Sequence, residues 1–210
     1  MIRRLREWIS APAAQAAGAD AVLGDPAAAD RLDQDLLALD RDPYLSVADR
    51  RLRVLSVFDD LRYDRADADM MSPAMRQHAI GKLSPLGFRQ TSGTVLENPE
   101  ADVRFLIPKF HALGASPFDI TRYTPKRDRD YYVLTPTQTA CRFIDSYRTQ
   151  EAVDRIKTLV AKHPINLYRL MDYLERKPAH QDFLGAIGHL KLVQREAIEA
   201  EPLRRRRALG

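Results

Sequence analysis

The chain has 210 residues, 45% of them apolar and 30% charged, which is the balance of an ordinary globular protein. A single cysteine, Cys141, excludes an intramolecular disulfide and a cysteine-rich zinc site. The net charge is +4 and would be near zero without the run Arg204–Arg207, so composition does not indicate a generally basic, nucleic-acid-binding surface. No segment resembles a signal peptide or approaches the roughly 18 apolar residues that span a bilayer, and we expect a cytoplasmic protein.

Residues 1–45 are predicted to form a flexible arm, because residues 11–30 are half alanine, interrupted by proline and glycine, and can bury little apolar surface. The arm contains two short amphipathic islands. Leu5 and Trp8 lie on one face of the first, and Leu32, Leu36 and Leu39 lie on one face of the second. Helices this short are marginal alone. We therefore interpret these five residues as docking contacts for a partner protein; packing on the chain's own body and, for residues 2–9, contact with an anionic membrane surface are the alternatives.

The folded body is predicted to begin at Ser46 and to extend to residue 203. Ser46 and Asp49 resemble a helix capping box, and apolar residues recur at helical spacing to about Tyr63, which predicts a helix. A second helix is predicted from Ser72, an N-cap residue followed by proline, to about Pro85.

Residues 88–134 have the two-residue period of strands. The segments 92–97 and 103–107 flank a turn at 98–100 and predict an antiparallel hairpin. Residues 118–123 suggest a short extra strand, and residues 130–134 a last one.

Helices follow to the end of the body. Thr135 and Gln138 form a capping box around Pro136, and three further helices are predicted around residues 153–160, 164–174 and 178–198, before a basic tail at 204–210. The predicted fold class is α+β, with a small antiparallel sheet of three or four strands at about residues 90–134 and a helical C-terminal half.

The long connection between the last strands mixes basic and aromatic side chains, which could neutralise phosphates and stack on bases. The residues predicted to bind nucleic acid under this interpretation are Arg104, Lys109, Arg122, Tyr123, Lys126, Arg127 and Arg129. Widening the window to residues 89–134 adds acidic residues and removes most of the charge excess.

No catalytic signature is present in the sequence. The five histidines lack metal-ligand spacing, no phosphate loop occurs, and Cys141 has no nearby histidine or aspartate partner, so we predict no metal, no cofactor and no assigned catalytic residue. The first hypothesis is a non-catalytic accessory protein that acts through a partner protein. A nucleic-acid-binding module is the second, and an enzyme whose site assembles only in three dimensions, for example around His111 and Asp119, is the third.

Overall fold

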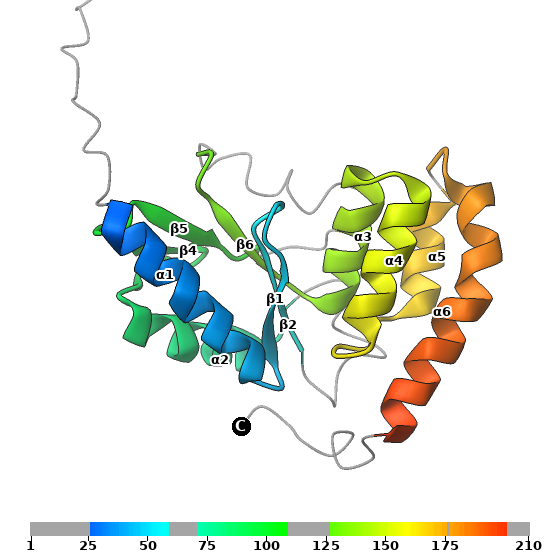
Figure 1. Cartoon of the computed structure of the whole chain (residues 1–210), viewed down its shortest axis with the longest axis horizontal. Coiled ribbons are helices and arrows are strands. Elements are labelled where there is room, and N and C mark those ends of the chain that lie inside the picture. The colour runs from blue at the N-terminus through cyan, green and yellow to red at the C-terminus, as the bar shows by residue number, and fades with distance from the viewer. Residues whose placement is uncertain (1–25, 59–70, 109–126, 176, 201–210) are drawn as a thin grey trace, which may run out of the picture.

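The computed structural model describes residues 26–58, 71–108, 127–175 and 177–200 (Figure 1). The helices are α1 (Pro26–Ala38), α2 (Pro73–Leu83), α3 (Pro136–Ser146), α4 (Thr149–Val160), α5 (Leu167–Leu174) and α6 (His180–Ala200). The strands are β1 (Leu45–Asp49), β2 (Val54–Val57), β3 (Arg89–Ser92), β4 (Val95–Asn98), β5 (Val103–Leu106) and β6 (Tyr131–Leu134). The sheet lies with α1 and α2 in one half of the molecule, and α3–α6 form the other half. None of the described helices is long and apolar enough to cross a membrane.

The six strands form one mixed sheet in the order β1-β2-β6-β5-β4-β3. The predicted α+β class and the predicted hairpin are confirmed, since β4 pairs antiparallel with β5 around the turn at 99–102. The sheet is larger than predicted and is not purely antiparallel. β6 inserts between the local hairpins and pairs parallel with both β2 and β5, and such pairing joins distant segments that local sequence patterns do not reveal.

The predicted helix beginning at Ser46 is wrong within the described residues, because β1 and β2 form an antiparallel hairpin there. Asp49 does not cap a helix; its Oδ1 accepts a hydrogen bond from the Leu52 amide, 2.8 Å away, and so stabilises the turn. All four residues of β2 are buried. A strand buried on both faces has no alternating polar pattern, so its apolar residues also match helical spacing.

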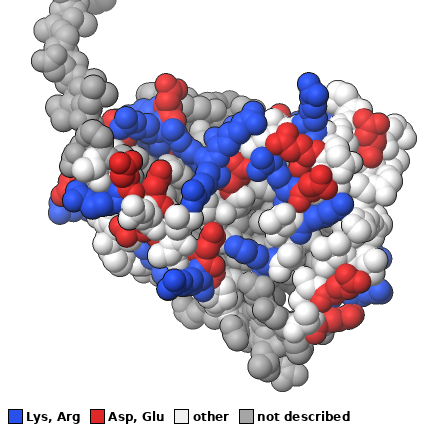
Figure 2. Space-filling view, viewed as in Figure 1, with Lys and Arg blue, Asp and Glu red and all other residues white. Residues whose placement is uncertain are grey.

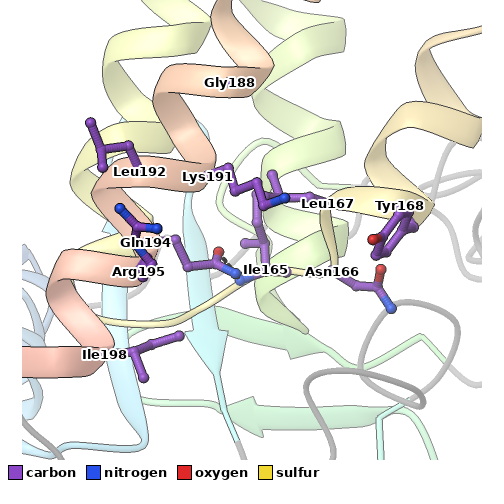
Figure 3. Close-up of a pocket in the computed structure, with 10 residues that line it drawn as sticks. All are labelled: Ile165, Asn166, Leu167, Tyr168, Gly188, Lys191, Leu192, Gln194, Arg195 and Ile198. Atoms are coloured by element: carbon purple, nitrogen blue, oxygen red, sulfur yellow. Dashed lines mark hydrogen bonds between the residues drawn. The ribbon is translucent and has the colours of Figure 1, made fainter.

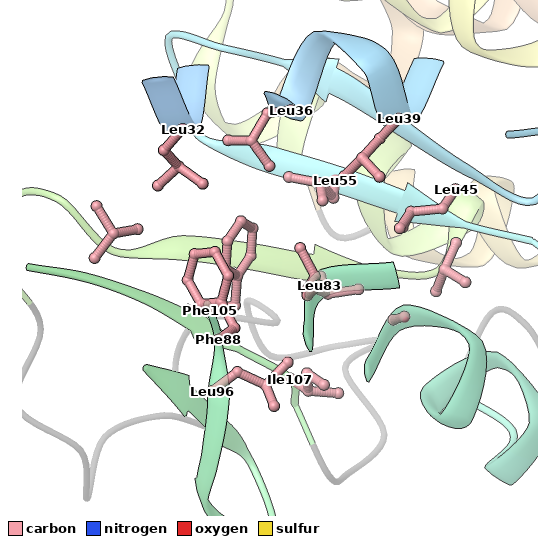
Figure 4. Packing of buried hydrophobic residues seen from close by; sticks show 14 of the residues in the cluster. Leu32, Leu36, Leu39, Leu45, Leu55, Leu83, Phe88, Leu96, Phe105 and Ile107 are labelled. Atoms are coloured by element: carbon pink, nitrogen blue, oxygen red, sulfur yellow. The ribbon is translucent and has the colours of Figure 1, made fainter. Parts of the chain in front are cut away.

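The helix α1 packs on the sheet and is part of the folded body. Leu32, Leu36 and Leu39 are buried in the cluster that also contains Leu55 and Phe105 (Figure 4). The interpretation of these three leucines as contacts for a partner protein is therefore corrected: their apolar face is covered by the chain's own sheet. Residues 26–45 of the predicted arm thus lie within the described fold, and residues 1–25 lie outside the described residues.

The four C-terminal helices share a second core, built around Phe143, Ile156, Leu170 and Phe183. The predicted capping box at the start of α3 is confirmed. Thr135 Oγ1 accepts from the Gln138 amide, and Gln138 Oε1 accepts from the Thr135 amide. These two bonds satisfy backbone donors that would otherwise be buried without a partner.

A buried histidine joins the two halves. His163 precedes α5, stacks on Phe58 and lies 2.8 Å from the Ser56 hydroxyl through Nδ1 and 3.2 Å from the Pro43 carbonyl oxygen through Nε2. Because a carbonyl oxygen can only accept, Nε2 donates to Pro43; in the neutral imidazole Nδ1 then accepts from the Ser56 hydroxyl. A second link runs from Asp49 in the sheet half to Tyr147 and Arg155 in the helical half.

Candidate functional site

The structure describes three of the seven residues predicted to bind nucleic acid. Arg104 donates to both carboxylate oxygens of Asp130, from Nε at 2.9 Å and from Nη2 at 2.7 Å, and its side chain is only 9% exposed. Arg127 lies 3.1 Å from Asp102 and 3.6 Å from Glu97. Arg129 is exposed and lines a pocket beside α1. Arg104 and Arg127 thus have carboxylate partners within the fold.

The other predicted site residues lie outside the described residues. They are Lys109, Arg122, Tyr123 and Lys126 of the long connection, Leu5 and Trp8 of the N-terminal arm, and the candidate enzymatic residues His111 and Asp119.

The helical half has a groove that the sequence analysis did not anticipate. A cavity of about 560 Å³ lies between α6 and the segment that leads into α5, residues 165–168 (Figure 3). Leu192 and Ile198 line it from α6, and Ile165, Leu167 and Tyr168 line it from the opposite side. Tyr168 is 80% exposed and Leu192 40% exposed, and both line the same cavity, so they form a shared apolar surface and not isolated exposed side chains.

The base of the groove is rigidly built. The Gln194 side chain accepts from the Ile165 amide at 2.9 Å and donates to the Ile165 carbonyl at 3.0 Å, which ties α6 to the opposite wall. Gly188 leaves open space above the helix, since a Cβ placed there would meet no atom within 4 Å. Lys191 adds positive charge beside the apolar surface, and so does Arg195, whose Nε lies 3.9 Å from the Glu199 carboxylate on the same helix. A preformed apolar groove with a few polar groups is typical of a binding site.

The signal for this groove exists in the sequence but is ambiguous. Gly188, Lys191, Leu192, Arg195 and Ile198 follow the three- and four-residue spacing of one helical face. The same spacing is found in helices whose apolar face is covered by a neighbour. Only the packing of α6 against α4 and α5 shows that this stripe is left open.

Two charged clusters have structural roles. The first surrounds Asp42, whose carboxylate is approached by His78 at 2.9 Å and Lys82 at 2.8 Å and also accepts from the Tyr44 amide. Burial alone would raise the pKa of Asp42, but these hydrogen bonds outweigh it and hold the pKa below its ordinary value.

The second cluster surrounds Asp49 at the boundary between the halves. The Tyr147 hydroxyl donates to Asp49 at 2.8 Å, and the Arg155 guanidinium carbon lies 4.0 Å from the centroid of the Tyr147 ring. Burial raises the pKa of Tyr147 to about 12, and the bond to Asp49 acts in the same direction. The tyrosine thus stays protonated as a donor near neutral pH.

Within the described ranges, no group of three or more histidine, cysteine, aspartate or glutamate side chains is arranged to hold a metal ion. Cys141 is buried in the helical core beside Phe143, as expected for a small apolar side chain. Comparisons with protein-family models, with curated proteins and with solved structures found no match.

Proposed function

We propose that the protein is a non-catalytic interaction protein that binds an amphipathic helical segment of a partner protein in the groove between α6 and residues 165–168. The observation that carries this proposal is the contiguous apolar surface of Tyr168, Leu192 and Ile198 around a cavity of about 560 Å³. Grooves of this kind bind the apolar face of a helix through side chains spaced three and four residues apart.

The charged side chains beside the groove indicate which charge the partner segment carries. Lys191 and Arg195 lie on the same helical face as Leu192, so a segment seated on that leucine would bring its flanking side chains near both cations. Acidic side chains beside the apolar anchors would be favoured, and basic ones would be repelled. The first amphipathic segment of the chain itself, residues 2–9, contains Arg3, Arg4 and Arg6 and would be repelled by the basic side chains beside the groove. This favours an acidic segment of another protein.

Site-specific photo-cross-linking in the cells that make the protein tests the proposal. A photoreactive phenylalanine analogue at Leu192 is expected to form an adduct with the partner, whereas the same group at Leu184 is not. Both leucines are on α6 and are similarly exposed, at 40% and 42%, but only Leu192 lines the groove. Peptide sequencing of the adduct should identify an acidic amphipathic segment.

A variant that fills the groove provides the second test of the proposal. Gly188→Trp is expected to abolish the adduct at Leu192, because the new side chain occupies the groove, while Gly81→Trp in α2 is the matched control. Both glycines are helical, and a Cβ atom added at either one would meet no atom within 4 Å, so neither change should disturb the core. Equal adducts at Leu184 and Leu192, or an adduct that Gly188→Trp leaves intact, would contradict the proposal.

A further inference from the structure

A second pocket lies in the sheet half, between α1 and the turn that joins β1 to β2. Its volume is about 320 Å³, and its charged walls come from three segments: Asp30 and Asp33 of α1, Arg50 and Arg53 of the turn, and Arg129 before β6. Tyr131 lies within it. Basic side chains gather over this turn on the face shown in Figure 2.

The arginines of this pocket differ from others in the described part of the sheet half. Arg104 and Arg127 pair with carboxylates, and Arg76 donates to the Gly93 carbonyl. The guanidinium groups of Arg50, Arg53 and Arg129 form no ion pair or hydrogen bond with another described residue. Nη1 of Arg53 is buried and has no hydrogen-bond partner among the described residues, although buried donors are normally satisfied.

The backbone of Arg53 is also unusual. Its φ is +52°, in the left-handed region that favours glycine. A side chain with a Cβ atom is strained in this region, because the Cβ approaches the following carbonyl oxygen. The arginine gains no ion pair within the described fold that would offset this strain, and residues held in such conformations concentrate at binding sites.

The other side chains that line the pocket limit which chemical groups the ligand can carry. Tyr131 donates to Asp33 at 3.3 Å, and its ring centroid is 5.9 Å from the Arg53 guanidinium carbon. Asp30 and Asp33 would repel an anion placed against α1 but can accept hydrogen bonds from hydroxyl or amino groups. Guanidinium groups suit the geometry and charge of phosphate.

We infer that this pocket binds a small phosphate monoester, with the phosphate held by Arg50, Arg53 and Arg129 and a hydroxyl or amino group of the ligand held by Asp30 and Asp33. The volume suits a ligand of nucleotide or sugar phosphate size. The inference does not depend on the groove of the helical half, because the two sites share no residue.

Isothermal titration of the full chain tests the inference with defined probes: glycerol phosphate, glucose phosphate, adenosine monophosphate, glucose and inorganic phosphate. At least one of the three monoesters is expected to bind. Glucose should not bind, because it lacks the anion, and inorganic phosphate should bind more weakly, because it does not reach the carboxylates. Absence of binding by all three monoesters would overturn the inference.

Variants test the placement of the phosphate. Arg53→Gly and Arg129→Ala are each expected to weaken binding about tenfold or more, because each removes a charge-assisted hydrogen bond. Arg53→Gly also relieves the backbone conformation, so loss of binding would not reflect unfolding. Arg169→Ala, an exposed arginine of α5, is the control and should bind normally.

A single-stranded oligonucleotide is the last probe. Binding that is tighter than that of every monoester and is lost in Arg53→Gly and Arg129→Ala would overturn the inference, because the pocket would then be part of a nucleic-acid-binding surface. The Gly188→Trp variant should bind the monoester normally, so failure at the groove and failure at this pocket are distinguishable.

Discussion

At the end of the sheet where β2, β5 and β6 begin, the arginines on the two faces differ in whether they pair with a carboxylate. On the face away from α1, Arg104 is buried and forms a two-bond ion pair with Asp130. On the face under α1, Arg53 and Arg129 lie beside a pocket and have no carboxylate partner among the described residues. Alternation of side chains along β5 places Arg104 and Val103 on opposite faces.

This difference separates charges that hold the fold together from charges that are available for binding. Leaving one member of a buried pair without its partner is costly, whereas removing an exposed, unpaired arginine costs little. The face under α1 depends instead on apolar contacts, because the leucines of α1 pack on Leu55 and Phe105. Three substitutions and their controls test this comparison, and a fourth tests the charged cluster around Asp42.

The largest effect is expected for Asp130→Ala, which leaves Arg104 buried and unpaired. The free energy of unfolding should fall by about 3–5 kcal/mol, measured by urea denaturation. Arg129→Ala, a change one residue away that removes an exposed cation, should alter it by less than about 0.5 kcal/mol. Similar losses in the two variants would show that the proposed division between the faces is incorrect.

Leu36→Ala tests the apolar contacts of the other face. Leu36 is 3% exposed and belongs to the core cluster, so its truncation should lower the free energy of unfolding by about 2–5 kcal/mol. Leu37→Ala is the matched control, since this neighbouring leucine of α1 is 45% exposed. Equal, small effects of the two substitutions in urea denaturation would show that α1 does not pack on the sheet and belongs to the flexible arm predicted from the sequence.

Asp42→Asn tests a carboxylate whose partners hold its pKa down. The variant should be less stable near neutral pH by about 2 kcal/mol, because it loses charge-assisted hydrogen bonds from His78 and Lys82. A carboxyl whose folded-state pKa is lowered contributes stability above its unfolded pKa and loses it as pH falls through the folded value. The difference between the two proteins should therefore shrink below about pH 4. A difference that stays constant in an acid denaturation series would contradict this assignment.

The smallest effect is expected for Arg53→Gly. Glycine relieves the positive φ but loses more conformational freedom on folding, so thermal unfolding should show unchanged stability or a gain of up to about 1 kcal/mol. Arg51→Gly in the same turn should be destabilising, because φ is not positive there and the guanidinium group 5.2 Å from the Tyr147 ring centroid is also lost. Clear destabilisation by Arg53→Gly would mean that this arginine supports the fold, like Arg104.

Local signals in the sequence predicted much of this fold. Ser72 and Thr135 begin the helices α2 and α3, and the turn after Asn98 joins β4 to β5, as expected. These features depend on hydrogen bonds between residues three or four positions apart. A short segment of sequence is therefore enough to specify them. The hairpin β1–β2 was missed because Val54 and Leu55 match both periods, and only pairing with β6 selects the strand.

The sequence by itself thus determined the starts of α2 and α3, the turn between β4 and β5, and the α+β class. Tertiary structure alone decided which apolar stripes are covered: that of α1 is buried under the sheet, and part of that of α6 is left open. It also decided which arginines have partners, since Arg104 meets Asp130 across 26 positions and Arg53 lines the same pocket as Arg129 across a longer separation. The reason is physical. Burial and ion pairing depend on which distant segments pack together, and local spacing carries no information about that choice.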